Sequence, residues 1–119
     1  RIVMVDDSIV RGTTSGIINN LLRNAGAKEI KLCISSPPVK YPCFFGIDTA
    51  ERKQLIAAKY STEEICSMIC ADALHYHSLE GLAESISCIK KEDMCFACFD
   101  GIYPEHVPHN GLGSMDDEE

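Results

Sequence analysis

The first fifteen residues constrain the fold more than any other part of this 119-residue chain. Residues 2–5 (IVMV) form a short, nearly continuous apolar run, which is typical of a strand buried on both faces in a parallel sheet. Two carboxylates, Asp6 and Asp7, follow directly, and the small and hydroxyl-bearing residues 12–15 (GTTS) lead into a helical pattern. The order strand, polar loop, helix predicts an α/β fold.

The polar residues after this strand predict a ligand site, because open α/β sheets bind ligands outside the carboxyl ends of their strands. Adjacent carboxylates can accept hydrogen bonds from sugar hydroxyls or hold Mg²⁺, which usually takes one or two carboxylates together with water and phosphate oxygens. Gly12 lets the backbone approach an anion, and a helix N-terminus offers free N–H groups and roughly +0.5 of a charge to a phosphate. The candidate binding residues are Asp6, Asp7, Ser8, Arg11, Gly12, Thr13, Thr14 and Ser15.

A simpler interpretation makes Asp6 and Asp7 part of a solvated turn and residues 13–15 an ordinary helix N-cap. Capping uses one hydroxyl or two. It leaves two carboxylates and Arg11 unexplained at a strand end, so we favour the binding site.

The segment DDSIVRGTTS at residues 6–15 resembles the PRPP-binding signature of type I phosphoribosyltransferases and, more closely, that of the glutamine PRPP amidotransferase family. The resemblance implies that Asp6 and Asp7 face the ribose hydroxyls and Mg²⁺, and that residues 11–15 hold the 5-phosphate of PRPP. It also implies purine nucleotides as inhibitors that reuse the same phosphate pocket.

Three of the seven cysteines carry a second resemblance. Cys95 and Cys98 form a C-x2-C pair, a pattern that also serves zinc and redox chemistry. Cys43 lies in the segment YPCFFGID at residues 41–48, and the pair lies in CFACFDGIYP at residues 95–104. Both contexts resemble those of the Bacillus-type class of the same family, which implies Cys43, Cys95 and Cys98 as ligands of a 4Fe-4S cluster whose fourth ligand lies upstream of Arg1.

The other four cysteines have a simpler interpretation as small apolar core residues. Cys33 alternates with apolar residues in an expected strand, and Cys66 and Cys70 are four apart on an expected helix face; we interpret Cys88 in the same way. His75 and His77 are interpreted as surface residues rather than metal ligands. An odd cysteine count without a signal-peptide-like start predicts a reducing, cytoplasmic setting.

Composition narrows the class of protein further. The formal net charge is −7, but the last four residues supply four of the 18 acidic side chains, which leaves −3 for the rest. No basic patch indicates nucleic-acid binding, and no apolar run approaches the ~20 residues of a membrane span. At 119 residues and 45% hydrophobic, the chain supports one small core.

Periodicity predicts the remaining elements. We expect a helix over residues 14–25 with Gly26 just after it, and a second strand over 29–35 parallel to the first. Prolines end regular structure between residues 36 and 42. A helix over 49–60 would turn the chain away from the sheet.

Two capped helices follow in the expected fold, the first starting at the capping box of Ser61 and Glu64 and the second at Ser78. Residues 72–76 form a short link between them, for which an extended conformation stays open, and Met68 is assigned to the core. We therefore expect the C-terminal portion of a type I phosphoribosyltransferase domain at 1–60, with a parallel sheet and a βαβ unit. A mostly helical Fe-S-binding segment follows at 61–104, and a disordered acidic tail at 105–119.

The resemblance implies a fragment of an enzyme that transfers ammonia from glutamine to PRPP to give 5-phosphoribosylamine, the first step of purine biosynthesis. The glutaminase domain would lie upstream, the full enzyme would be a homo-oligomer, and the fragment alone would be inactive. Two alternatives stay open at this point. One is another type I phosphoribosyltransferase or a PRPP-sensing regulator, and the other is a non-enzymatic metal-binding module.

Overall fold

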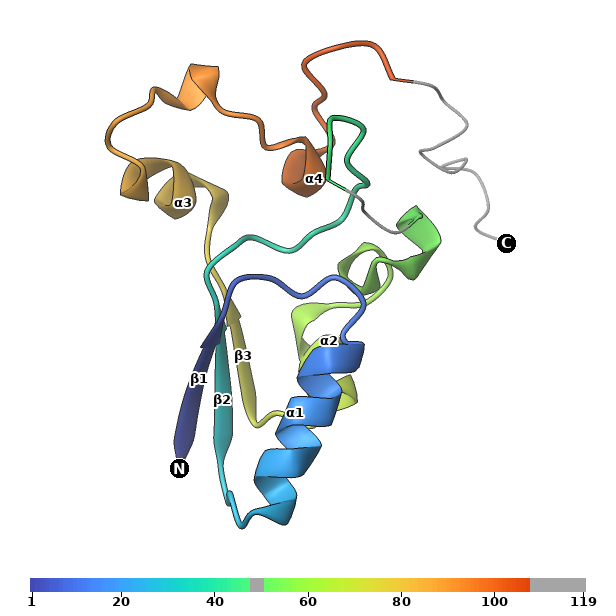
Figure 1. The fold of residues 1–119 in the computed structure, drawn as a ribbon, viewed down its shortest axis with the longest axis vertical. Coiled ribbons are helices and arrows are strands. Elements are labelled where there is room, and N and C mark those ends of the chain that lie inside the picture. Colours follow the sequence, from blue (N-terminus) through green and yellow to red (C-terminus); the bar gives the residue numbers. More distant parts are fainter. Residues whose placement is uncertain (48–50, 108–119) are drawn as a thin grey trace.

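The computed structural model describes residues 1–47 and 51–107 (Figure 1). The three strands form one parallel sheet in the order β1-β2-β3. Helix α1 covers one face of this sheet, while α3 and α4 lie beyond the carboxyl ends of the strands (Figure 1). The elements are β1 (Ile2–Asp6), α1 (Thr13–Asn24), β2 (Ile30–Ile34), the 3-10 helices η1 (Arg52–Gln54) and η2 (Ile56–Ala58), α2 (Thr62–Met68), β3 (Ala73–Tyr76), α3 (Leu79–Ser85), η3 (Lys91–Asp93) and α4 (Ala97–Asp100).

The predicted strand-helix-strand unit is confirmed. β1 and β2 are parallel, with Ile2 opposite Ile30 and Asp6 opposite Ile34. Gly26 follows the end of α1 with φ of 101°, a conformation that glycine adopts without a steric cost. The inward residues of β2 alternate with outward ones as expected.

The core forms where β2, β3, α2 and the loop after β1 meet. Its members are aliphatic side chains, and each of the isoleucines and leucines contributes about 1.5–3 kcal/mol when fully buried. They are Ile9, Leu32, Ile34, Ile56, Ala57, Ile65, Ile69 and Leu74. Because Ile9 belongs to this cluster, the loop between β1 and α1 is anchored to the core.

The prediction that β1 is buried on both faces is wrong for this chain. Val3 is 65% exposed and Val5 is 72% exposed, whereas Met4 packs against the core. β1 is an edge strand, and within residues 1–47 and 51–107 its outward face has no covering element.

The predicted helix over 49–60 is replaced by two short 3-10 helices, with residues 49 and 50 outside the described part of the chain. Leu55 separates η1 from η2 because its backbone is extended, with ψ of 111°. This segment does not turn away from the sheet, since Leu55, Ile56 and Ala57 are all buried. Apolar burial against the core outweighs the local helical pattern here.

The capping box that opens α2 is confirmed, since the Glu64 N–H donates to the Ser61 hydroxyl and the Ser61 N–H donates to the Glu64 carboxylate. Ser78 caps α3 with a single bond, because its hydroxyl accepts from the N–H of Gly81. Met68 does not belong to the core: it is 51% exposed at the last position of α2, whereas Ile65 in the same helix is buried.

The expected link over residues 72–76 is a third strand. β3 pairs in parallel with β2, with Leu32 opposite Leu74. This strand lies inside the segment 61–104 that was expected to be mostly helical, and the core has members on both sides of residue 60. The division of the chain into domains at that residue stays a prediction.

The core assignment of the four remaining cysteines is only partly right. Cys33 and Cys66 are half-buried, and Cys66 packs against the core, where burial raises its thiol pKa. Cys70 and Cys88 are exposed. Cys70 lies beyond the end of α2 with φ of 59°, so it does not share a helix face with Cys66.

His75 and His77 are exposed, as predicted. Of the tail expected at 105–119, residues 108–119 lie outside the described residues. Over residues 1–47 and 51–107, none of the helices combines the length and apolar character required to span a membrane.

Candidate functional site

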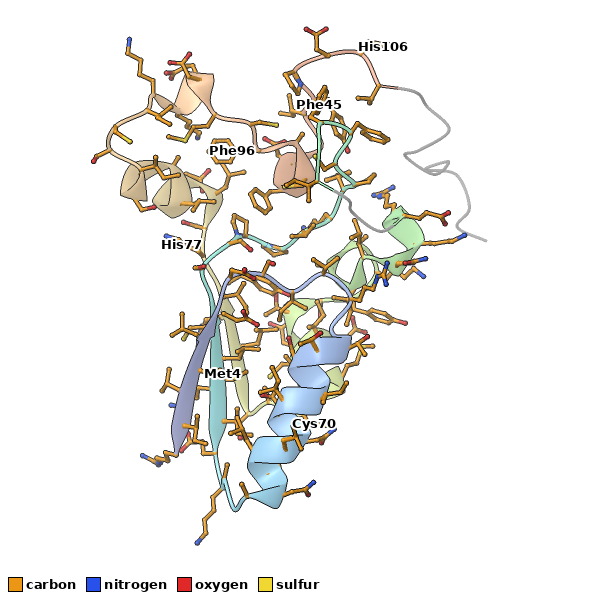
Figure 2. All side chains as sticks on the ribbon, viewed as in Figure 1. Met4, Phe45, Cys70, His77, Phe96 and His106 are labelled. Carbon is orange, nitrogen blue, oxygen red and sulfur yellow. The ribbon has the colours of Figure 1, made fainter. Side chains whose placement is uncertain are left out.

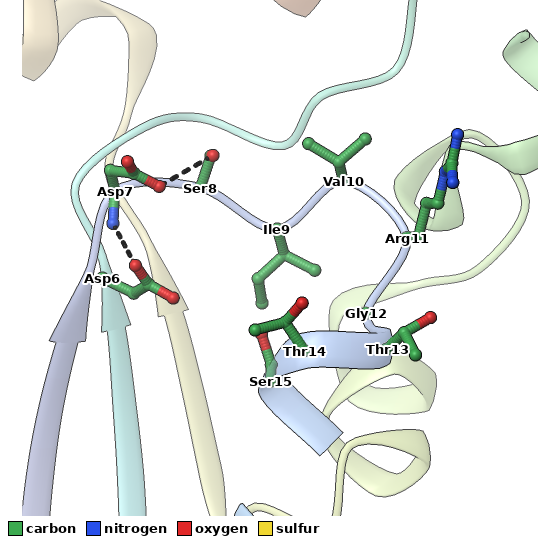
Figure 3. A pocket seen from close by; sticks show the side chains of 10 residues that line it. All are labelled: Asp6, Asp7, Ser8, Ile9, Val10, Arg11, Gly12, Thr13, Thr14 and Ser15. Atoms are coloured by element: carbon green, nitrogen blue, oxygen red, sulfur yellow. Dashed lines mark hydrogen bonds between the residues drawn. The ribbon is translucent and has the colours of Figure 1, made fainter. Parts of the chain in front are cut away.

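All eight candidate binding residues line one pocket of about 550 Å³, together with Ile9 and Val10 (Figure 3). The residues that line the pocket are continuous in sequence. They start with Asp6 at the carboxyl end of β1 and end with Ser15 in the first turn of α1. The structure therefore brings together the strand-end carboxylates and the helix N-terminus that the sequence pattern connected.

The two carboxylates are held in place by their neighbours. Asp6 Oδ1 accepts a hydrogen bond from the N–H of Asp7 at 2.9 Å, and Asp7 Oδ1 accepts one from the Ser8 hydroxyl at 2.9 Å. The Asp7 carboxylate lies beside Ser8, and the Asp6 carboxylate lies next to the N–H of Asp7 (Figure 3). A carboxylate offers about four lone-pair sites, so both groups keep capacity for a hydroxyl or a cation.

The N-terminus of α1 is arranged to receive an anion. Its N-cap residue is Gly12, with φ of 78° and no side-chain cap. The first bond of the helix runs from the N–H of Gly16 to the carbonyl of Gly12 at 3.0 Å, so the N–H groups of residues 13–15 precede the helical ladder. Since no hydroxyl caps this helix, the N-cap interpretation of residues 13–15 is wrong.

Two contacts fix the position of the loop between Asp7 and Gly12. Ile9 is 2% exposed and inserts into the core, and the carbonyl of Val10 accepts a hydrogen bond from the N–H of Ile56 at 2.9 Å. Sequence reasoning missed both supports. Ile9 carried a signal, as an apolar residue among polar ones, but the contact from Ile56 joins residues too distant along the chain for a local pattern to reveal it.

Arg11 takes a different position from the other candidate residues. It is exposed, and its side chain points away from Asp6 and Asp7 (Figure 3). Arg11 therefore lies at the rim of the pocket, where a cation can attract a phosphate as it enters.

Hydrogen bonds and an aromatic contact connect the segments that carry Cys43 and Cys98. The carbonyl of Cys98 accepts hydrogen bonds from the N–H groups of Lys40 and Tyr41, at 2.9 and 3.1 Å. The Tyr103 hydroxyl donates to the carbonyl of Pro42 at 2.6 Å, and the Tyr103 ring packs edge-on against Phe44. These contacts join two parts of the chain that are about sixty residues apart.

The three cysteines expected to act together lie near one another. Burial, and then the neighbouring Cys43 and Cys95 thiols and Asp100, raise the pKa of Cys98, while a backbone hydrogen bond lowers it. Cys70 lies at the opposite end of the molecule from Phe45 and Phe96, which flank this region (Figure 2). The thiols of Cys43, Cys95 and Cys98 are therefore grouped in one region, and Cys70 lies far from them.

Thiolates are the ligands that zinc and iron-sulfur centres prefer, so the chemistry of Cys43, Cys95 and Cys98 fits such a group. In the described ranges, no three His, Cys, Asp or Glu side chains already adopt a metal-holding arrangement. The three thiols suit either kind of centre, and their side chains are not arranged around one in the structure.

Comparisons with known proteins give consistent matches. The chain is 52% identical over 112 residues to the amidophosphoribosyltransferase of Bacillus subtilis, covering 90% of this chain and 23% of that protein. It is 51% identical over 108 residues to the enzyme of the same name from Methanothermobacter thermautotrophicus, covering 91% and 23%. No protein-family model matches.

Among solved structures, the chain is similar to glutamine PRPP amidotransferase from B. subtilis, described as complexed with ADP and GMP. The TM-score is 0.85 at 49% sequence identity, over 94% of this chain and 25% of that one. This chain spans about a quarter of the length of the relatives it matches. The resemblance to the glutamine PRPP amidotransferase family and the α/β fold class are confirmed over nine-tenths of the chain.

Proposed function

We propose that this chain is part of an amidophosphoribosyltransferase, in which it binds the ribose and 5-phosphate of PRPP. The observation that carries the proposal is the single pocket in which Asp6 and Asp7 at a strand end meet the N-terminus of α1. The matches extend over both the phosphate loop and the cysteine-bearing segments, which favours this function over another phosphoribosyltransferase, a PRPP-sensing regulator or a metal-binding module.

In the proposed reaction, ammonia released from glutamine displaces pyrophosphate from the anomeric carbon of PRPP and gives 5-phosphoribosylamine, opening purine biosynthesis. Charge develops on the ring carbon and on the leaving group, so positioning and electrostatics supply the catalysis. Asp6 and Asp7 would hold the ribose hydroxyls. The free N–H groups of residues 13–15 and the hydroxyls of Thr13 and Thr14 would hold the 5-phosphate.

Mg²⁺ is the cation that this carboxylate pair suits, because it needs few protein ligands when phosphate oxygens complete its shell. Asp6 and Asp7 would bind it directly or through water, and it would neutralise charge on the pyrophosphate. A purine nucleotide carries the same ribose 5-phosphate, so AMP or GMP would occupy the same residues and inhibit. The GMP bound to the B. subtilis enzyme supports this part of the proposal.

We further propose that Cys43, Cys95 and Cys98 hold a 4Fe-4S cluster together with a fourth cysteine outside this sequence. The cluster would be structural and would fix the cysteine-bearing segments to the rest of the enzyme. A cluster held by thiolates suits a reducing, cytoplasmic setting, which we propose for this protein. The glutaminase domain and a homo-oligomeric assembly belong to the whole enzyme, so we expect this chain alone to be inactive.

The test of ligand binding is the substitution Asp7→Asn, measured by calorimetric titration of the intact protein with PRPP in the presence of Mg²⁺. The amide keeps the shape of the carboxylate but loses the charge that faces the cation and the ribose. We expect at least about a tenfold weaker binding, equivalent to about 1.4 kcal/mol. Asp93→Asn is the matched control, because Asp93 is an exposed residue of η3 outside the pocket. Equal PRPP affinity in the parent and Asp7→Asn would contradict the proposed site.

A further inference from the structure

The cysteine-bearing region and the phosphate loop are connected by a series of contacts that starts at Tyr41. The N–H of Tyr41 donates to the carbonyl of Cys98 at 3.1 Å. The Tyr41 ring lies against Gly101, the C-cap of α4, so closely that a Cβ at Gly101 would be 2.9 Å from Tyr41 Cζ. Backbone and ring of Tyr41 are therefore both fixed to the segment that carries Cys98.

The second contact passes from Tyr41 to Arg52. The guanidinium carbon of Arg52 lies 5.0 Å from the centroid of the Tyr41 ring, within the range of a cation-π interaction. Arg52 is the first residue of η1, and its carbonyl accepts a hydrogen bond from the N–H of Leu55 at 3.0 Å. Leu55 is fully buried and is the N-cap of η2, so this hydrogen bond connects Arg52 to η2.

The third contact passes from η2 to the phosphate loop. The N–H of Ile56 donates to the carbonyl of Val10 at 2.9 Å. A Cβ placed on Gly12 would lie 2.9 Å from Ile56 Cδ1, so Ile56 also supports the N-cap of α1. Both Val10 and Gly12 line the pocket.

We propose that Tyr41 and Arg52 are positioning residues for the phosphate-binding loop. Their cation-π contact holds residues 52–56 in place, and Ile56 in turn fixes Val10 and Gly12 so that the N–H groups at the start of α1 face the phosphate. Neither Tyr41 nor Arg52 lines the pocket, so the effect is transmitted through Ile56. The nature of the ligand rests on the proposed function, whereas the positioning of the loop does not.

The experiment compares Arg52→Gln with Lys53→Gln in the intact protein. Lys53 is a matched control because it lies on the same 3-10 helix but pairs with Glu51 at 2.6 Å and is 72% exposed. The first measurement is the affinity for GMP, and the second is amide hydrogen exchange at Ile56 and in residues 8–12. Because the variant loses the cation-π contact, we expect Arg52→Gln to bind GMP about two- to fivefold more weakly than the parent protein and to exchange faster at Ile56.

A double-mutant cycle separates positioning from a general loss of stability. Tyr41→Leu should weaken GMP binding to the same extent as Arg52→Gln, and the double variant should be no weaker than either single one. Arg52→Lys keeps the cation and Tyr41→Phe keeps the ring, so both variants should bind GMP as tightly as the parent protein does. Additive effects, or equal effects of Arg52→Gln and Lys53→Gln, would overturn the proposal.

The two measurements also separate this inference from the proposed function. If the parent protein binds no GMP, the proposed nucleotide site fails, and hydrogen exchange at Ile56 alone decides the positioning role. Unchanged exchange in Arg52→Gln refutes that role even when GMP binds to the parent protein.

Discussion

At Gly12 two independent constraints exclude a side chain. Its φ of 78° lies in the left-handed region that other residues avoid, and a Cβ would come within 2.9 Å of Ile56 Cδ1. The same residue is the N-cap of α1 and part of the pocket. Gly12 thus allows the turn from loop to helix and the close approach of Ile56 to the loop.

We predict that Gly12→Ala destabilises the protein by about 1–2 kcal/mol, the usual cost of a non-glycine residue in this conformation, and also weakens phosphate binding. Gly26→Ala is the control, because Gly26 also has a positive φ but has nothing within 4 Å of its Cβ position. Thermal unfolding and PRPP titration of both variants check the prediction. A loss of PRPP affinity of the same size in Gly26→Ala would show that the effect at Gly12 is only global.

At the scale of elements, Asp72 joins α1, β2 and the approach to β3 at the amino-terminal end of the sheet. Its Oδ2 accepts a hydrogen bond from the N–H of Ile30 at 2.7 Å and forms an ion pair with Arg23 at 2.5 Å. Asn19 makes a second connection, donating from Nδ2 to the carbonyl of Ile69 at 2.8 Å. These side chains hold α1 in register with the strands, which positions its N-terminus at the pocket.

The Ile30 N–H first, and then Arg23, hold the pKa of Asp72 below its ordinary value of 3.8. The folded state therefore binds this proton less readily than the unfolded state. The resulting stability is present above the unfolded pKa and is lost as the pH falls through the lower, folded pKa.

We predict that Asp72→Asn unfolds at lower urea concentration than the parent at pH 7, and that this difference shrinks at about pH 3. Urea denaturation at the two pH values measures the effect. Asp93 is an exposed residue of η3, so Asp93→Asn should unfold at the same urea concentration as the parent at pH 7. A difference between Asp72→Asn and the parent that stays constant with pH would contradict the ionic role of Asp72.

At the scale of the whole molecule, two candidate sites are arranged around one small core. The phosphate loop lies directly on the core through Ile9, while the cysteine-bearing region lies beyond the carboxyl ends of the strands (Figure 1). Several large apolar side chains in this region, including Phe45 and Ile102, are about half or more exposed. Aromatic packing and backbone hydrogen bonds stabilise this region, and few of its side chains are fully buried.

The proposed cluster makes a prediction at this scale. In intact protein purified anaerobically, Cys98→Ser should lose most of its iron, sulfide and broad absorption near ~400 nm, because a thiolate ligand is removed. Cys88→Ser should keep them, since Cys88 is exposed and has no part in the proposed ligand set. Unfolding of the Cys98 variant at lower temperature would then follow from loss of the cluster. Retention of iron by Cys98→Ser would refute its role as a ligand.

The sequence by itself determined the strand-loop-helix unit, the capped starts of α2 and α3 and eight of the ten residues that line the pocket. Each depends on residues within a few positions of one another: the apolar run before Asp6, the hydroxyl of Ser61 three residues before Glu64, and the continuous stretch 6–15. Local sterics and hydrogen bonding decide such features, so a local pattern reveals them.

Only the tertiary structure decided the strand character of residues 73–76, the exposure of Val3 and Met68, and the support of the loop by Ile56. Four residues carry too little periodicity to distinguish a strand from a link, and β3 forms because β2 offers it a hydrogen-bonding edge. Exposure depends on which elements cover a face, and the contact from Ile56 to Val10 depends on how a distant segment packs. These are properties of the folded chain as a whole, because burial of apolar surface selects among local alternatives that are nearly equal in free energy.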